Sequence, residues 1–92
     1  MKTEVHLSKL AEKQLKKLPQ HIVLKFFGWV ELLKDHGLNE ARKVKGYHDE
    51  PLLGDRQGQR SIRLSRSYRA IYRKVGLRFE LIEVLEVSKH EY

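Results

Sequence analysis

The sequence predicts an α+β fold of order β-α-α-β-β-β, in which two N-terminal helices pack on one twisted, mainly antiparallel sheet. Three observations predict this class. A weakly alternating segment opens the chain, two amphipathic segments separated by Pro19 follow, and three runs rich in β-branched and aromatic residues lie after residue 60. We expect one domain over residues 1–92, because two independent hydrophobic cores do not fit in 92 residues.

The first strand and the first helix are expected within the first 18 residues. Residues 2–7 alternate between polar and apolar side chains, which favours a strand. Ser8 suits the N-cap of a helix that runs to about Leu18, although Ala11 stands where a capping box has Glu or Gln. Pro19 ends this helix, because the residue before a proline avoids the α region. Its apolar face consists of Leu10, Ala11, Leu15 and Leu18.

The second helix is expected from about Gln20 to His36. Gly37 would stop it, since glycine is favoured just past the end of a helix. Its apolar face is broad and consists of Ile22, Val23, Phe26, Phe27, Val30 and Leu33. Three further apolar residues lie at the border of this face or behind it, namely Leu24, Trp29 and Leu32. These three are either scattered surface residues or part of a contact with a partner.

Residues 38–58 are rich in turn-forming residues and predict a loop with a short strand near Arg42–Lys45. The stretch that follows, QRSIRLSRSYRAIYRK at residues 59–74, is ambiguous. Its apolar residues are spaced like one face of a basic helix, yet residues 61–65 alternate strictly and residues 65–67 resemble a turn. Strands are favoured, with Gly76 joining the second to a central strand over Phe79–Val87 that is apolar on both faces.

The charge pattern favours a polyanionic partner. The formal net charge is +7, and from Arg56 to Arg78 the chain has eight basic residues and no acidic one. Such a charge suits nucleic acid, an acidic protein or a membrane surface. Arginine binds phosphates and stacks on bases, and Tyr68 and Tyr72 add stacking surfaces of the kind used for single-stranded RNA. A solvated strand pair that is simply basic is the alternative interpretation.

Several classes of chemistry find no support in the sequence. The chain has no cysteine, which excludes disulfides and thiolate sites and suits a reducing cytosol. No apolar run approaches the roughly 18 residues of a membrane span, and the N-terminal residues lack the apolar core of a signal peptide. The five histidines show no metal-ligand spacing, so neither a metal nor another cofactor is expected. We therefore expect a cytoplasmic protein without a membrane partner.

Three segments resemble the RelE/ParE superfamily of type II toxin–antitoxin toxins, closest to the RelE, YoeB and HigB mRNA interferases. They are SYRAIYR at the start of a predicted strand, EPLLGDRQGQRSIRL before it, and VSKHEY at the C-terminus. The EPL and GDR pieces are similar to loop elements of the YoeB and HigB branches. Val87-Ser88-Lys89-His90 is similar to the tail of RelE itself.

The resemblance implies a metal-independent endoribonuclease that enters the ribosomal A site and cuts mRNA there. The ribose 2′-hydroxyl attacks the adjacent phosphate and leaves a 2′,3′-cyclic phosphate and a 5′-hydroxyl. The implied partners are a cognate antitoxin, mRNA and the 70S ribosome with its 16S rRNA, and operator DNA only through the antitoxin complex. Such a reaction needs a base, an acid and cations that stabilise the phosphorane.

The resemblance also suggests four catalytic residues. Arg69 matches the family's strand arginine and would stabilise the phosphorane, unless it pairs with a glutamate of the final strand. Glu50 matches the catalytic glutamate of the YoeB branch and would be the base, unless it is only a solvated loop residue. His90 or Tyr92 would be the acid, although the order His90-Glu91-Tyr92 departs from the known branches and a frayed terminus is the alternative.

Other basic and aromatic residues are candidates for RNA contacts. Arg63 and Arg66 would hold flanking phosphates or provide general attraction to ribosomal RNA. The remaining candidates are Lys45, His48, Arg60, Tyr68, Arg73 and Lys89. Two other functions stay open at this stage: a ParE-like toxin that inhibits DNA gyrase without a nuclease site, and a non-catalytic RNA-binding module.

Overall fold

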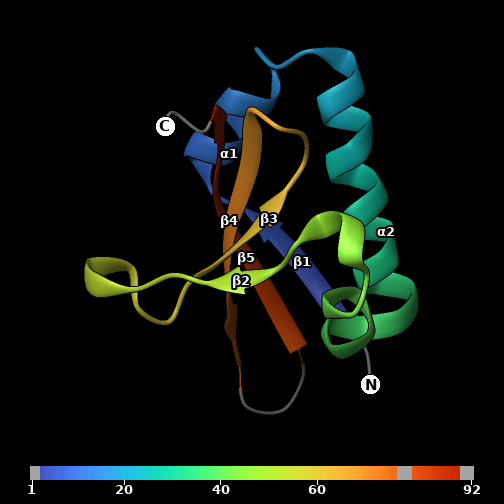
Figure 1. The fold of residues 1–92 in the computed structure, drawn as a ribbon, viewed down its shortest axis with the longest axis vertical. Helices are drawn as coiled ribbons and strands as arrows, with labels where there is room; N and C mark the ends of the chain where they lie inside the picture. Colours follow the sequence, from blue (N-terminus) through green and yellow to red (C-terminus); the bar gives the residue numbers. More distant parts are fainter. Residues whose placement is uncertain (1–2, 77–79, 90–92) are drawn as a thin grey trace.

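The computed structural model describes residues 3–76 and 80–89. Two helices lie against a sheet of five strands, and two short 3₁₀ helices lie between α2 and β3. Figure 1 shows α2 along one side of the sheet, with α1 near the end at which β4 begins. The elements are β1 (Thr3–Leu7), α1 (Lys9–Leu15), α2 (Gln20–Arg42), η1 (Lys45–Tyr47), β2 (Glu50–Pro51), η2 (Gly54–Arg56), β3 (Arg60–Arg63), β4 (Tyr68–Val75) and β5 (Glu80–Lys89).

The sheet has the order β1-β5-β4-β3-β2. β1 is parallel to β5, and the other neighbours are antiparallel. The predicted α+β class and the order β-α-α-β-β-β are therefore confirmed, and β2 is an additional strand of two residues. β5 lies between β1 and β4, so the predicted central strand is confirmed, and its residues from Glu80 to Ser88 are all buried or half-buried.

The N-cap of α1 is the predicted Ser8. Its hydroxyl accepts a hydrogen bond from the Ala11 amide at 3.0 Å and donates one to the Leu85 carbonyl at 2.7 Å, so the same side chain caps α1 and ties it to β5. α1 ends at Leu15, earlier than expected, and residues 16–18 form a turn before Pro19. The placement of Leu10 on the buried face was wrong, because its side chain is 51% exposed.

Gly37 interrupts α2 but does not end the helical region. Its backbone has φ 82° and ψ 170°, and the helix then resumes as far as Arg42. The Leu38 amide that this break leaves without a helical partner donates to the Glu80 carboxylate at 2.8 Å. Leu38 and Ala41 are buried, so the segment packs on the core as a helical turn. The short strand predicted at Arg42–Lys45 was therefore wrong.

The arginine stretch forms two strands, as the alternation of residues 61–65 predicted. β3 and β4 are antiparallel, and the amides of Leu64 and Ser65 both donate to the Tyr68 carbonyl, at 2.9 and 3.2 Å, which closes the turn between them. The helical alternative for this stretch was wrong. The reason is tertiary, since the apolar residues of β4 pair and pack with β5 on one side and β3 on the other.

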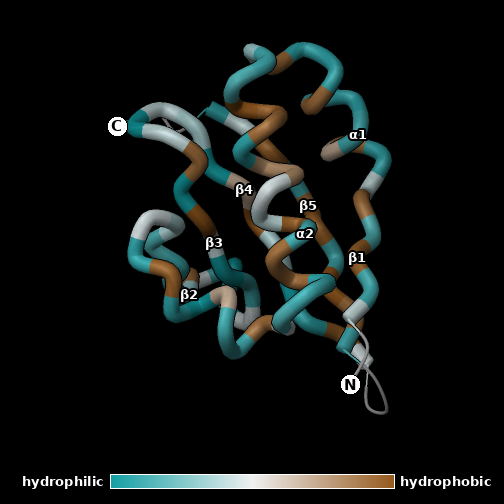
Figure 2. The backbone as a smooth tube through the Cα atoms, turned by 90° about the vertical axis from the view of Figure 1, so that its right-hand side faces the viewer, coloured by the Kyte–Doolittle hydropathy of each residue, from teal (hydrophilic) through white to brown (hydrophobic). Residues whose placement is uncertain are grey.

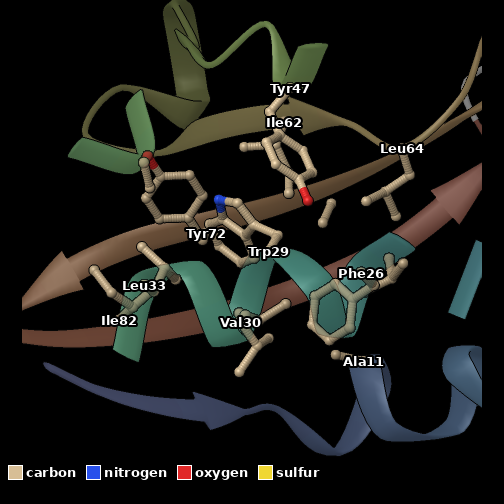
Figure 3. Close-up of a cluster of buried hydrophobic side chains, with 14 of the residues drawn as sticks. Ala11, Phe26, Trp29, Val30, Leu33, Tyr47, Ile62, Leu64, Tyr72 and Ile82 are labelled. Carbon is tan, nitrogen blue, oxygen red and sulfur yellow. The ribbon is translucent and has the colours of Figure 1, made fainter. Parts of the chain in front are cut away.

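Aromatic side chains fill the core between α2 and the sheet. Figure 3 shows Trp29 of α2 beside Tyr72 of β4, with ring centroids 5.1 Å apart. Trp29 and Tyr72 are both fully buried, so the surface position expected for Trp29 and the RNA-stacking surface expected at Tyr72 were wrong. Phe27, which the helical wheel placed on the buried face, is 45% exposed. Apolar and polar bands alternate along α2 in Figure 2. In the described residues, no helix is both long enough and apolar enough to cross a membrane.

Candidate functional site

Two arginines lie directly opposite each other on the face of the sheet away from the helices. Along β3 and β4, Ile62 and Ala70 face the core, so their neighbours Arg63 and Arg69, which are paired across the strands, face the other way. Like charges in directly opposed positions destabilise a sheet. This arrangement is typical of a surface that binds an anion, which would relieve the repulsion.

A cavity of about 230 Å³ opens at this pair of arginines. It lies where β3 turns into β4, and three arginines face one glutamate around it. Six of the predicted site residues contribute to its walls: Glu50 and Arg69 of the proposed catalytic set, and His48, Arg63, Arg66 and Tyr68 of the proposed RNA-binding set. Ser61, Ile62 and Ser65 complete the lining. Residues separated by up to 21 positions in sequence thus share one cationic hollow.

The short strand β2 brings the acidic residue to this cavity. Glu50 pairs with Ser61 of β3, and Ser61 pairs with Ile71 of β4, so Glu50 lies on the same face as Arg69. The Glu50 carboxylate is 3.4 Å from the Nε2 atom of His48, and both side chains are more than half exposed. A carboxylate beside an imidazole is a pair of side chains of the kind that general acid–base catalysis uses.

The arginines of the cavity differ from their neighbours in their ion pairs. Arg73 is 3.0 Å from Glu83, and Arg56 is 3.1 Å from Glu86. Within residues 3–76 and 80–89, no carboxylate lies at ion-pair distance from the three cavity arginines, Arg63, Arg66 and Arg69. In β5 the residue opposite Arg69 is Ser88 rather than a glutamate. Among the described residues, the positive charges of these three arginines are therefore not neutralised and can attract an anion.

Not all of the predicted residues reach the cavity. Arg60 and Arg73 are engaged in ion pairs outside it, with Asp49 and Glu83. Lys45 lies on η1 and Lys89 at the end of β5, opposite Tyr68, and neither lines the cavity. The predicted acids His90 and Tyr92 lie outside the described residues. No three His, Asp or Glu side chains converge in a way that would hold a metal ion in the described ranges.

No pattern in the sequence indicated the role of Asp49. Its side chain is only 1% exposed and receives hydrogen bonds from Arg60 Nε at 2.6 Å and from the Tyr72 hydroxyl. Burial raises the pKa of Tyr72, and the hydrogen bond and charge of Asp49 raise it further. Burial alone would lower the pKa of Arg60, but Asp49 outweighs it and the pKa is raised. Asp49 stands in a turn-rich segment whose pattern does not distinguish a buried carboxylate from a solvated one.

Comparison with solved structures gives matches over nearly the whole chain. YafQ in the E. coli DinJ–YafQ toxin–antitoxin complex is similar with a TM-score of 0.74 and 21% identity, over 98% of this chain and 94% of that one. RelE in the archaeal RelE–RelB complex from Pyrococcus horikoshii gives 0.73 and 24%, over 97% and 96%. The YoeB/ParE toxin from Agrobacterium tumefaciens gives 0.72 and 19%, over 96% and 99%.

The chain has the fold of the RelE, YoeB and YafQ toxins. The fold that the sequence resemblance implied is thereby confirmed. No protein-family model matches the sequence, and comparison with curated protein sequences gives no significant match. With identities of 17–24%, the likeness to this RelE/YoeB-type fold establishes the architecture, and the activity has to be argued from the chain's own residues.

Proposed function

We propose that this protein is the toxin of a type II toxin–antitoxin system and cleaves mRNA in the ribosomal A site. The observation that carries the proposal is the cavity at the β3–β4 turn, where Arg63, Arg66 and Arg69 gather around one His–Glu pair. Cations at a phosphate and an adjacent proton acceptor are the two requirements of attack by a ribose 2′-hydroxyl. The cytoplasm, where ribosomes are found, is the proposed location.

In the proposed mechanism four of the cavity residues have defined roles. Glu50 removes the proton from the 2′-hydroxyl as its oxygen attacks the adjacent phosphorus. Arg69 stabilises the additional negative charge of the phosphorane, and Arg63 and Arg66 hold the flanking phosphates. The 5′-oxygen leaves with a proton from His90 or Tyr92, which follow β5 in the chain. No step of this reaction requires a metal or a redox cofactor.

The second element of the proposal is a cognate antitoxin. The matched YafQ and RelE structures are complexes with DinJ and RelB, and the chain shares their fold. An antitoxin with an acidic segment would neutralise the cavity arginines, which have no carboxylate partners in the described residues. If a small reading frame adjoins the gene, coexpression of its product should restore growth and yield a complex that copurifies.

Cleavage of mRNA on programmed 70S ribosomes tests the activity directly. Mapping of the mRNA ends should show cuts within the A-site codon by the wild type. Arg69→Ala should slow single-turnover cleavage by roughly 10²–10⁴-fold, because it removes a cation that acts at the reacting phosphate. Arg73→Ala is the matched control, since Arg73 is on the same strand and paired with Glu83.

Three results would contradict the proposal. Absence of A-site cleavage by the wild type, together with inhibition of gyrase supercoiling, would indicate a ParE-like toxin. Tight and salt-sensitive binding of naked RNA without cleavage would indicate an RNA-binding module. Equal cleavage by wild type and Arg69→Ala would show that the chemistry does not use the cavity arginine.

A further inference from the structure

Asp49 is a buried carboxylate between two residues that line the cavity. Its side chain is 1% exposed, whereas those of His48 and Glu50 on either side are 67% and 55% exposed. A buried carboxylate is stable only with hydrogen bonds or a cation, and Asp49 has both, from Arg60 and from the Tyr72 hydroxyl. The two cavity residues are thus joined through the backbone to one anchor in the interior.

The partners of Asp49 belong to the central strands of the sheet, and one of them is part of the hydrophobic core. Tyr72 is fully buried in the middle of β4, against Trp29 of α2. Arg60 is the residue of β3 that pairs with Tyr72. The raised pKa of Tyr72 keeps its hydroxyl protonated, so it remains a hydrogen-bond donor to the carboxylate. Asp49 is therefore fixed relative to the core of the sheet.

The backbone around Asp49 needs such an anchor. His48 has φ 45° and ψ 53°, and it is the one non-glycine residue with positive φ in the described residues. Left-handed backbone is unfavourable for a residue with a Cβ atom and persists only where the surroundings enforce it. β2, which carries Glu50, has only two residues. Its pairing with β3 alone is too short to hold His48 in this backbone conformation.

We propose that Asp49, held by Arg60 and Tyr72, is a positioning residue that sets His48 and Glu50 at the rim of the cavity facing Arg69. What His48 and Glu50 do there rests on the proposed function, whereas their placement is a property of the fold. Asp49 itself points away from the cavity and takes no part in the chemistry. Through it, the packing of β3 and β4 determines the geometry of the proposed base.

The test compares Asp49→Asn with the wild type on programmed 70S ribosomes. The variant keeps the size of the side chain but removes the charge that attracts Arg60. Single-turnover cleavage should fall roughly 10- to 100-fold, because a small displacement of a reacting group has an effect of this order. Affinity for the ribosome should stay within about 2-fold, since the cavity arginines that attract phosphates are unchanged.

Glu80→Gln is the matched control. Glu80 is also a buried carboxylate, whose Oε1 accepts hydrogen bonds from the Thr3 hydroxyl and the Leu38 amide at 2.8 Å each. It begins β5, at the end of the sheet away from the β3–β4 turn. Both this variant and Asp49→Asn should have a lower melting temperature than the wild type, but Glu80→Gln should cleave at the wild-type rate at temperatures where both variants are folded.

A second measurement separates positioning from activity. The His48 ring signals in an NMR spectrum, identified by their loss in His48→Gln, should move in Asp49→Asn and stay unchanged in Glu80→Gln. If the wild type fails to cleave mRNA, the proposed function fails and the NMR comparison still decides the positioning role. Wild-type cleavage with equal losses in Asp49→Asn and Glu80→Gln, or unmoved His48 signals, would overturn the inference.

Tyr72→Phe covers the case in which Asp49→Asn does not fold. It removes one hydrogen bond to Asp49 and keeps the buried ring in place. We expect a smaller reduction in cleavage, of a fewfold, and displaced His48 signals. Cleavage at the wild-type rate with unmoved His48 signals would overturn the inference by itself.

Discussion

The Tyr72 hydroxyl makes stability depend on pH in the alkaline range. Burial and the Asp49 carboxylate hold its pKa well above the ordinary value of 10.0. Above about pH 10 the unfolded chain loses this proton and the folded protein keeps it, so the folded state binds more protons and becomes less stable as pH rises. The contribution of the protonated Tyr72 hydroxyl to the free energy of unfolding is fully present below pH 10 and is lost as the pH rises through the raised pKa.

Urea unfolding of the wild type and Tyr72→Phe between pH 8 and pH 11 measures this effect. At pH 8 the wild type should be more stable by about 1 kcal/mol, the contribution of one buried hydrogen bond. Above pH 10 the difference should shrink by up to about 1.4 kcal/mol per pH unit, the effect of one proton. If the free energies of unfolding of the two proteins change in parallel from pH 8 to pH 11, the raised pKa of Tyr72 is contradicted.

At the scale of residues, the sequence could not show which arginines line the cavity and which form ion pairs with carboxylates elsewhere in the protein. Arg60, Arg63, Arg66 and Arg69 recur every third residue and look equivalent. The structure separates them because Asp49, from a different element, occupies Arg60, while Arg63 and Arg66 line the cavity. The assignment of Glu50 and Arg69 to one site came from the family resemblance, since a separation of 19 positions gives no periodic signal.

At the scale of elements, Gly37 determines how α2 connects to the segment that leads to the cavity. Its φ of 82° and ψ of 170° lie in a region that only glycine populates readily. Gly37→Ala should destabilise the protein by about 1–3 kcal/mol, the typical cost of such backbone strain. A Cβ atom there would be 3.7 Å from Glu80 Oε1, an ordinary contact, so the loss would arise from the backbone.

Gly46→Ala provides the control for Gly37→Ala. Gly46 lies in η1 without a positive φ, and a Cβ atom there would meet no atom within 4 Å. We expect its effect on the free energy of urea unfolding to stay within about 0.5 kcal/mol, as for surface substitutions in general. A similar loss for both variants would show that the conformation of Gly37 is not the cause.

The segment from Gly37 to β2 contains the elements that could not be predicted from this sequence. The cap of α1 was predictable, because its signal lies in neighbouring residues. The strands over residues 60–63 and 68–75 were favoured by the alternation of residues 61–65, although their pairing with β5 was needed to exclude a helix. The helical turn after Gly37 was not predictable, since it depends on Glu80, 42 positions away from Leu38. β2 was missed for a similar reason, because two residues form no period and their pairing partners lie in β3.

At the scale of the whole molecule, the net charge of +7 attracts any polyanion. The arginines of the cavity add specific phosphate contacts to the affinity that this general attraction provides. The two can be separated by salt dependence, because each phosphate contact releases counterions and adds about 0.7–0.9 to the slope of log affinity against log salt. General attraction depends on total charge. A specific contact depends on which arginine is removed.

Ribosomes programmed with an mRNA that carries 2′-deoxy sugars in the A-site codon allow this measurement, because they cannot be cleaved by 2′-hydroxyl attack. Arg66→Ala and Arg73→Ala each remove one positive charge. Only Arg66 lines the cavity, whereas Arg73 is compensated by Glu83. The salt slope should fall by about 0.7–0.9 for Arg66→Ala and by less than half of that for Arg73→Ala. Equal reductions would mean that net charge, and not the arrangement of arginines at the β3–β4 turn, governs docking on the ribosome.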